Sequence, residues 1–256
     1  MQQDLPRTDV VIPSIDRGWW SWAGAHGGRT LALLGDHTGA HAAGFAPRSV
    51  HASFLTPIAD GDLHAAVECV RKGRSSAVVT ARLTHEGKPA VLTTSLFGAA
   101  GDGLTHQGVG MPAVPPPEDC EDAADILTAM VPYAQHLGMR PTDNVLLDPK
   151  EAGTARIRVW LTAKDPSPSA VADALIFLDA IPPSLWALNH EFIPIPSVDA
   201  AFHFTDGLDQ MDAKDWSLVE VATERVGAGW LVESGSLWSR DGVLLASSRQ
   251  TRRVLG

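Results

Sequence analysis

Cysteine is scarce in this chain, with two residues among 256. Cys69 and Cys120 lie far apart in the sequence and form no CxxC pair. The composition therefore excludes a disulfide framework and a structural zinc site built on cysteines. A reducing, cytoplasmic environment is the expectation that follows.

Positive charge is also in short supply. The chain has 20 Lys and Arg residues against 30 Asp and Glu residues, which gives a formal net charge of −10. This balance disfavours nucleic acid and anionic membrane surfaces as partners, because both carry dense negative charge. The 45% content of hydrophobic residues is that of an ordinary globular protein.

Targeting signals and long apolar runs are missing as well. The segment MQQDLPRTDVVIPSIDRGWW has no basic region followed by an apolar one, and no apolar run of about 18 residues stands out elsewhere. We therefore expect a protein that is neither exported nor inserted in a membrane.

Several familiar catalytic motifs do not occur. The absence of GxSxG, Walker A, GxGxxG and HExxH removes the serine-hydrolase elbow, the common nucleotide loops and the zinc-protease helix from consideration. His37 and His41 can share a helical face, but no third metal ligand follows at a suitable spacing. Neither a metal ion nor a cofactor is expected.

An internal repeat is the strongest positive signal. SVHASF at 49–54 has a counterpart in SVDAAF at 197–202, and two further pairs of similar segments follow in the same order. The sequence thus predicts two halves with one plan, divided into residues 1–105, a linker with a helix at 106–150, and residues 151–256.

Each half predicts a strand, a helix and then an antiparallel meander, which is an α+β fold. The helices are expected at 29–44 and 168–188, preceded by strands at 18–24 and 154–164. In the first half, the later strands are expected at 49–55, 63–70, 76–85 and 90–98. The linker predicts one more helix, at 119–137, that packs on the outside.

An ionisable residue stands inside the second expected helix. Asp179 interrupts the apolar segment ALIFLDAIPPSLWAL, and Pro182 and Pro183 should end or kink the helix soon after it. An unpaired buried carboxylate is costly, so Asp179 should find a partner or face a cavity. The residues alone leave open a carboxylate satisfied by backbone amides and a catalytic one.

Six segments together resemble the double hotdog acyl-CoA thioesterases of type II and their actinobacterial thioesterase-like relatives. They are HGGRTLALL, SVHASFLTPIADGD, GKPAVLTTSLF, LIFLDAIPPSLW, PSVDAAFHF and DGVLLASSRQ. The resemblance implies two tandem hotdog repeats, each an antiparallel sheet wrapped around a central helix. It also implies a role in lipid metabolism, as a hydrolase of fatty or related acyl-CoA thioesters.

The resemblance further implies a catalytic trio. In the family, an Asp on the second helix, a Thr or Ser on the next strand and a Gln on the last strand hold the nucleophilic water. The matching residues are Asp179, Ser197 and Gln250. A carboxylate can deprotonate water, while a hydroxyl and an amide can orient it. Asp199 is a secondary candidate, because alternation along a strand places it on the face of Ser197.

The first half does not repeat the trio. Ser49 matches Ser197, but Ser95 falls at the position of Gln250, so one active centre per chain is expected. Gly27 and Gly28 are candidates for substrate binding, since free amides at a helix start can stabilise an oxyanion. Alternatively, these glycines only permit close packing of the helix.

Arg249, Arg252 and Arg253 lie at or just after the end of the proposed catalytic strand, and Arg249 and Arg252 are the main candidates to bind the phosphate groups of coenzyme A. A solvated strand end is the alternative. Exposed edge strands often pair in the resembled family, so a homo-oligomer is also considered. The sequence does not fix the length or type of the acyl chain.

Two other functions stay open. GDHTGAH carries Asp36 and His41 at a spacing similar to that of hotdog enoyl-CoA hydratases, although the usual Asn and Pro are missing. The third hypothesis is a non-catalytic double hotdog that binds an acyl chain in a lining supplied by some of the eight tryptophans.

Overall fold

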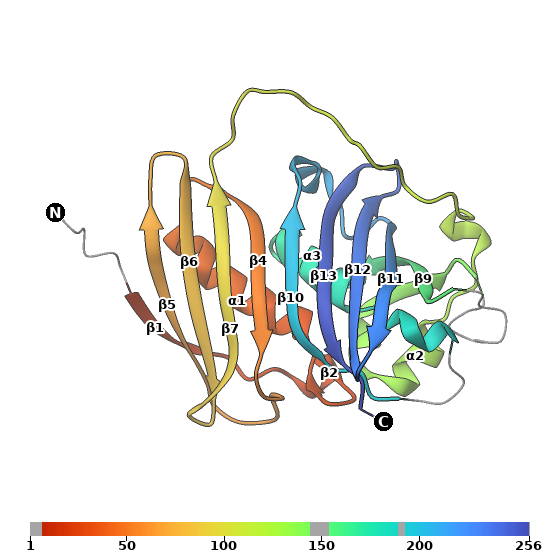
Figure 1. Cartoon of the computed structure of the whole chain (residues 1–256), viewed down its shortest axis with the longest axis horizontal. Coiled ribbons are helices and arrows are strands. Elements are labelled where there is room, and N and C mark those ends of the chain that lie inside the picture. The colour runs from red at the N-terminus through yellow and green to blue at the C-terminus, as the bar shows by residue number, and fades with distance from the viewer. Residues whose placement is uncertain (1–6, 144–153, 189–192, 256) are drawn as a thin grey trace.

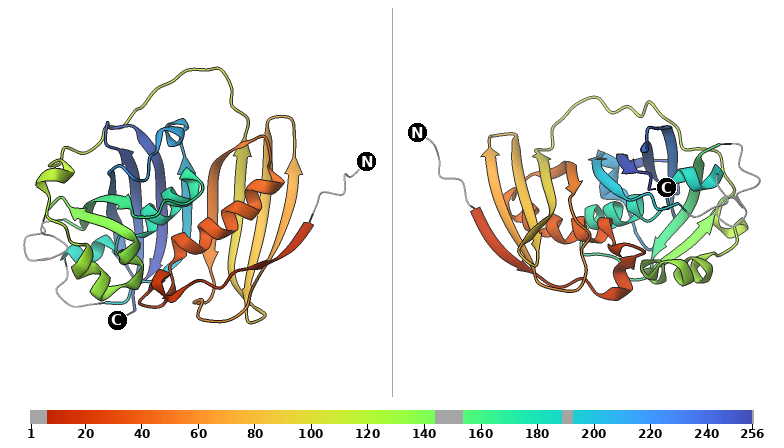
Figure 2. Two further views of the ribbon diagram at one scale, coloured as in Figure 1. Left: turned by 180° about the vertical axis from the view of Figure 1, so that it is seen from behind. Right: turned by 60° about the horizontal axis from the view of Figure 1, so that its bottom comes forward.

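The computed structural model describes residues 7–143, 154–188 and 193–255. In these residues an 11-stranded antiparallel sheet has the order β1-β5-β6-β7-β4-β10-β13-β12-β11-β9-β8. The two central helices lie side by side on one face of this sheet (Figures 1 and 2). The expected α+β double hotdog fold is confirmed, with each half of the sheet wrapping one helix.

The first half contains helix α1 (Gly27–His41) and five consecutive strands of the sheet, from one edge to its centre. These strands are β1 (Arg7–Ile12), β4 (Ala46–Phe54), β5 (Leu63–Lys72), β6 (Ser76–His85) and β7 (Lys88–Gly98). A small separate hairpin pairs β2 (Trp20–Ser21) with β3 (Gly24–Ala25).

The second half contains helix α3 (Ala170–Asp179) and six strands, of which β8 comes from the linker. The strands are β8 (Leu137–Pro141), β9 (Arg156–Ala163), β10 (Ser197–Phe204), β11 (Ser217–Gly227), β12 (Trp230–Ser239) and β13 (Leu244–Arg253). The chain between β7 and this half passes over one end of the sheet (Figure 1) and then forms helix α2 (Ala124–Met130).

Helix α3 is the buried core element of its half. The Ser169 hydroxyl accepts a hydrogen bond from the Ala172 amide at 3.2 Å and caps the first turn. Every residue from Ala172 to Leu178 is buried. The helix ends at Asp179, shortly before Pro182 and Pro183, so of the two outcomes expected at these prolines the structure shows an end and not a kink, and α3 is shorter than the expected 168–188.

The segment Ala170–Leu188 overturns one expectation from the sequence. It has the length and the mean hydropathy, 1.5, of a membrane-spanning helix, although no such run was expected. In the fold, 67% of it is buried inside the protein. Its apolar character is accounted for by a place in the core.

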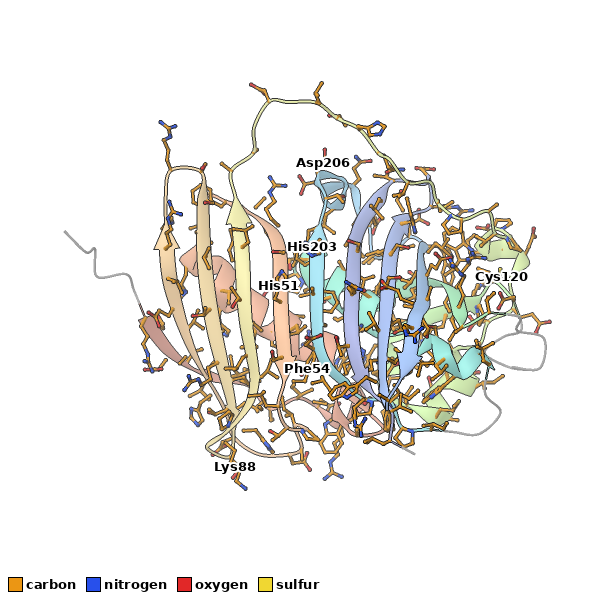
Figure 3. The ribbon with its side chains drawn as sticks, in the orientation of Figure 1. His51, Phe54, Lys88, Cys120, His203 and Asp206 are labelled. Atoms are coloured by element: carbon orange, nitrogen blue, oxygen red, sulfur yellow. The ribbon has the colours of Figure 1, made fainter. Side chains whose placement is uncertain are left out.

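The repeated segments meet at the centre of the sheet. Ala52 of β4 and its repeat equivalent Ala200 of β10 are direct partners across the strand pair, so the two halves are related by local pseudo-twofold symmetry. Figure 3 shows His51 and His203 side by side there, with ring centroids 5.5 Å apart. The internal repeat therefore builds the junction between the halves.

The strand register corrects one repeat match. Ala200 pairs with Gln250, and the equivalent Ala52 pairs with Thr93. Thr93, rather than Ser95, occupies the position of Gln250 in the first half. The lengths of the intervening turns differ between the halves, so sequence similarity alone gave a match two residues too late.

Two other expected elements differ from those observed. Residues 18–24 form the end of a 3₁₀ helix (Arg17–Trp19) and the short β2–β3 hairpin instead of a strand. The expected helix at 119–137 is limited to α2, because Pro132 opens a separate 3₁₀ helix (Pro132–His136). The linker also does not pack only on the outside, since Leu127 and Tyr133 are buried in the core.

We predict that Gly28→Ala lowers the free energy of unfolding by about 1 to 3 kcal/mol, as overpacking does. A Cβ at this position would lie 2.4 Å from the Leu175 carbonyl oxygen of α3, where backbone must move. Gly35→Ala in the same helix is the matched control, because its Cβ would meet no atom within 4 Å. It should raise stability by about 0.5 to 1 kcal/mol. Urea denaturation of both variants checks the pair, and equal effects would contradict the packing role of Gly28.

Candidate active site

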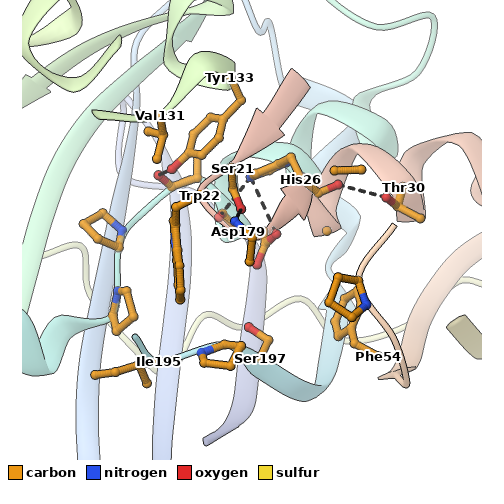
Figure 4. A pocket seen from close by; sticks show the side chains of 18 of the residues that line it. Ser21, Trp22, His26, Thr30, Phe54, Val131, Tyr133, Asp179, Ile195 and Ser197 are labelled. Carbon is orange, nitrogen blue, oxygen red and sulfur yellow. Dashed lines mark hydrogen bonds and ion pairs between the residues drawn. The ribbon is translucent and has the colours of Figure 1, made fainter. Parts of the chain in front are cut away.

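A cavity of about 500 Å³ is lined by both halves and by the linker. Its walls are mostly apolar and include Phe54, Ile58, Val131, Ile181 and Ile195. Figure 4 shows Asp179 and Ser197 facing this cavity between Trp22 and Phe54. Ionisable groups inside an otherwise apolar cavity make it the candidate active site.

Asp179 reaches the cavity from the last turn of α3 and joins the two halves. Its Oδ2 accepts a hydrogen bond from the Gly28 amide of α1 at 2.8 Å. This amide is one of the donors that a helix leaves unsatisfied at its N-terminus, where the helix dipole also favours negative charge. The carboxylate of α3 thus caps α1.

His26 stands at the N-cap of α1, directly beside this carboxylate, and is 2% exposed. Its Nδ1 accepts from the Arg29 amide at 3.2 Å, so Nε2 carries the proton and donates to the Asp179 carbonyl oxygen at 3.1 Å. The same Nε2 lies 3.5 Å from Asp179 Oδ2. Burial lowers the pKa of His26, and the carboxylate opposes this only in part.

Tyr133 of the linker packs against His26 and the end of α3. Its hydroxyl donates to the Ala180 carbonyl oxygen at 2.7 Å, and its ring lies 4.3 Å from that of His26. Burial and the nearby carboxylate of Asp179 raise the pKa of Tyr133, so the phenol stays protonated. His26, Tyr133 and Gly28 together fix the end of α3.

The second carboxylate oxygen of Asp179 is available for chemistry. Oδ1 has no hydrogen-bond partner among the described residues, and the side chain is 12% exposed where it lines the cavity. One oxygen is held in place, while the other is left without a partner in a side chain that lines the cavity. This arrangement suits a base that acts on a bound water.

A β-bulge brings Ser197 to the cavity. Strand alternation turns Ala200 and Phe202 inward, so an unbroken strand would turn Ser197 outward together with Asp199. The register shifts between Ser197 and Asp199, and Ser197 lines the cavity instead. Its hydroxyl donates to Oε1 of the buried Gln250 at 2.7 Å.

Asp199 does not share the face of Ser197, contrary to the expectation. It is exposed, and its Oδ1 accepts from the Thr251 amide at 3.2 Å. The bulge, which the sequence pattern does not reveal, separates the two residues.

Gly27 and Gly28 have different roles at the start of α1. The Gly28 amide already donates to Asp179, whereas the Gly27 amide has no partner in the described part of the chain. Gly27 lines the cavity, and a Cβ there would lie 2.8 Å from Asp179 Oδ2. Gly27 is therefore the glycine that can donate to a ligand, and Gly28 serves the contact between the helices.

The three arginines at the C-terminal strand do not form one cluster. Arg249 is exposed and donates to Glu224 at 2.7 Å, and Arg253 donates to the Gly229 carbonyl oxygen at 2.6 Å. Arg252 points to the other face, where it is buried beside Glu233 and lines the cavity. Because side chains alternate along β13, arginines that are close in the sequence lie on opposite faces of the sheet.

The GDHTGAH segment lies away from the cavity. Asp36 is exposed, and His41 contacts Thr8 through Nε2 and the His37 carbonyl oxygen through Nδ1, each at 3.1 Å. None of these residues lines the cavity. The described residues contain no group of three metal-ligating side chains.

Sequence reasoning missed His26 and Tyr133. His26 stands directly before the two glycines of the HGG segment, at the start of the expected helix. Its position in the sequence was therefore a signal for a helix N-cap beside the site. Tyr133 comes from the linker, and no local pattern connects it to α3.

Comparisons with known proteins agree with this geometry. Residues 16–98 match the model of the acyl-CoA thioesterase N-terminal domain, and residues 117–254 match that of the C-terminal domain. The chain belongs to the acyl-CoA thioesterase family. A search of curated proteins gave no match.

Solved structures share the fold of this thioesterase family member at low identity. A hot dog fold protein of unknown function from Alicyclobacillus acidocaldarius is 21% identical, with a TM-score of 0.86 over 100% of this chain and 95% of the other. The TesB protein of Mycobacterium avium subs paratuberculosis is 18% identical, with a TM-score of 0.76 over 99% and 96%. The acyl-CoA thioesterase II TesB2 of Mycobacterium marinum is 21% identical, with a TM-score of 0.73 over 91% and 90%.

We predict that the free energy of unfolding decreases as the pH is lowered below about 6.5. The substitution His26→Asn should make this decrease smaller. Burial lowers the pKa of His26 in the folded protein below that of the unfolded chain, so the unfolded chain binds the proton more readily and falling pH favours unfolding in this range. Asn retains an N-cap acceptor without titrating. One group contributes at most about 1.4 kcal/mol per pH unit. Urea denaturation from about pH 7.5 to 5 measures the difference in slope; equal slopes would show that His26 titrates normally in the fold.

Proposed function

We propose that the protein hydrolyses acyl-CoA thioesters with a water activated by Asp179 and oriented by Ser197 and Gln250. The observation that carries the proposal is the carboxylate of Asp179, which lines an apolar cavity with Oδ2 held by the Gly28 amide and Oδ1 without a hydrogen-bond partner among the described residues. Ser197 lines the same cavity, and its hydroxyl donates to Oε1 of Gln250, which is buried and is not itself among the lining residues. The acyl-CoA thioesterase family of the chain supports this reaction.

The proposed first step is attack by water on the thioester carbonyl carbon. Asp179 Oδ1 accepts a proton from the water as its oxygen bonds to that carbon, and the carbonyl oxygen becomes an oxyanion. The Ser197 hydroxyl donates a hydrogen bond to Gln250 and keeps its proton. A lone pair of the same hydroxyl can therefore accept a hydrogen bond from the water. These contacts hold the water in line with the carbonyl.

The second step expels the thiol. The oxyanion re-forms the carbonyl, the carbon–sulfur bond breaks, and the proton on Asp179 passes to the departing sulfur. The products are a carboxylic acid and free coenzyme A. The Gly27 amide, at the positive end of α1, is the donor that we assign to the oxyanion.

The assignment of coenzyme A phosphates to Arg249 and Arg252 stays a prediction. Arg249 is exposed, whereas the buried Arg252 lies too far inside to meet solvated phosphates in this conformation. We also propose a cytoplasmic location, in keeping with two free cysteines in the described residues. Homo-oligomer formation remains an expectation from the resemblance.

The two alternative functions make different predictions. The hydratase hypothesis needs Asp36 and His41 at the substrate, and neither lines the cavity. A non-catalytic binding protein would bind acyl-CoA without releasing free thiol. Thiol release from a panel of acyl-CoAs, measured beside hydration of an enoyl-CoA, separates the three functions.

We predict that Asp179→Asn lowers turnover of a good acyl-CoA substrate by about 10² to 10⁴, as loss of a general base does. An Asn oxygen can still accept from the Gly28 amide, so the midpoint of thermal unfolding should stay near that of the unmodified protein. Ser197→Ala and Gln250→Ala should lose less, because each removes one orienting contact.

Asp36→Asn and His41→Ala are the matched controls, since both residues lie outside the cavity. Both variants should keep full turnover. Normal turnover in Asp179→Asn together with loss in either control would refute the proposed site.

A further inference from the structure

The linker contributes one wall of the cavity, which we call the linker wall. Its side chains are apolar apart from one phenol, and they are those of Leu127, Met130, Val131, Tyr133 and Met139. The part of the lining that comes from the first half is more polar and includes Ser21, Thr30 and Thr56. The linker wall therefore suits the hydrocarbon of an acyl group, and the opposite lining suits the polar part of coenzyme A.

Met130 is the exposed part of the linker wall. It is 58% exposed although it lines the cavity, whereas Leu127 and Met139 are buried. Hydrocarbon that covers this side chain removes apolar surface from water, and the flexible thioether can adapt its shape to it. An acyl chain long enough to reach Met130 is therefore expected to pack on the end of α2.

Tyr133 connects the linker wall to the end of α3. The Val131 amide donates to the Leu127 carbonyl oxygen at 2.8 Å, and Tyr133 follows two positions later. The Tyr133 hydroxyl donates to the carbonyl oxygen of Ala180, the residue after Asp179, at 2.7 Å. In Figure 4, Val131 and Tyr133 lie on the same side of the cavity. A side-chain hydrogen bond thus joins the wall that suits the acyl chain to the proposed base.

The end of α3 depends on donors from outside the helix. Carbonyl groups in the last turn of a helix have no partner within it. Here the Asp179 carbonyl oxygen accepts from His26 at 3.1 Å, and the ring of Tyr133 packs 4.3 Å from that of His26. A displacement of Tyr133 therefore shifts the last turn that carries Asp179. A misplacement of about 1 Å in a reacting group can cost about 10²-fold in rate.

We propose that Tyr133 is a positioning residue that couples the length of the acyl chain to the alignment of Asp179. This inference rests on the proposed thioesterase function. A chain that packs on Met130 and Val131 orders the linker wall, and Tyr133 then holds the end of α3 in the reactive arrangement. A shorter chain does not give this support. Binding energy from the distant part of the substrate thus raises kcat as well as affinity.

The test measures kcat and KM separately for saturated straight-chain acyl-CoAs from butyryl-CoA to decanoyl-CoA. In the unmodified protein, kcat should rise along the series by about twofold to tenfold, the value of one neutral hydrogen bond. Tyr133→Phe keeps the ring in the wall but removes the donor, so this rise should disappear while KM keeps its dependence on chain length. A hydroxyl with only a structural role would lower kcat equally for every chain. An equal rise in both proteins would overturn the inference.

Thr162→Val is the matched control. The Thr162 hydroxyl donates to the carbonyl oxygens of Ala213 and Lys214, at 3.1 and 2.9 Å, and does not line the cavity. This variant also loses a hydroxyl that is bonded to backbone carbonyl groups, and it should keep the rise in kcat. Urea denaturation measures the stability of both variants. Loss of the rise in Thr162→Val as well would show that lost stability is the cause, and would contradict the role of Tyr133.

Hydrogen exchange separates this inference from the proposed function. Thioether analogues of butyryl-CoA and decanoyl-CoA cannot be hydrolysed, and the Gly28 amide, which donates to Asp179, reports how firmly the carboxylate is held. At saturation, the decanoyl analogue should slow exchange of this amide more than the butyryl analogue does, and Tyr133→Phe should abolish the difference. The difference without thiol release from any acyl-CoA would support Tyr133 and contradict the thioesterase function. Thiol release with neither this difference nor the rise in kcat would do the reverse.

Discussion

The carboxylate of Asp179 at the N-terminus of α1 is the contact on which the site depends. A helix start needs acceptors for its free amides, and a carboxylate at a helix C-terminus faces the negative end of its own dipole. Placing the end of α3 against the start of α1 meets both needs, through the Gly28 amide at 2.8 Å. Because the helices come from different halves, this contact exists only when the two hotdogs join.

The same junction accounts for one proposed site per chain instead of two. Local symmetry pairs Ala52 with Ala200, yet Gln250 is matched by Thr93. In the proposed site, the first half contributes the amides of its helix start, while the second half contributes the side chains of Asp179, Ser197 and Gln250. Duplication supplied two similar scaffolds, and their side chains then took different tasks around one cavity.

The sequence predicted the fold well, because period-two alternation and turn residues determine strands such as β6 with little help from distant contacts. It also singled out Asp179 as an ionisable group that should find a partner or face a cavity, and in the structure Asp179 does both. It could not reveal the bulge at Ser197, which depends on the register with β13, or the place of Tyr133 beside His26. Those features arise from contacts between segments far apart in the chain, and they are the ones that assemble the site.

The central claim is that Asp179 acts on a water and does not itself attack the thioester. A single turnover in water enriched in heavy oxygen, with protein in excess over acyl-CoA, tests this directly. Mass spectrometry of the released acid should show one heavy oxygen from the first turnover and none in Asp179. Unlabelled acid in the first turnover, with heavy oxygen in the Asp179 side chain, would show a covalent acyl intermediate and would contradict the account.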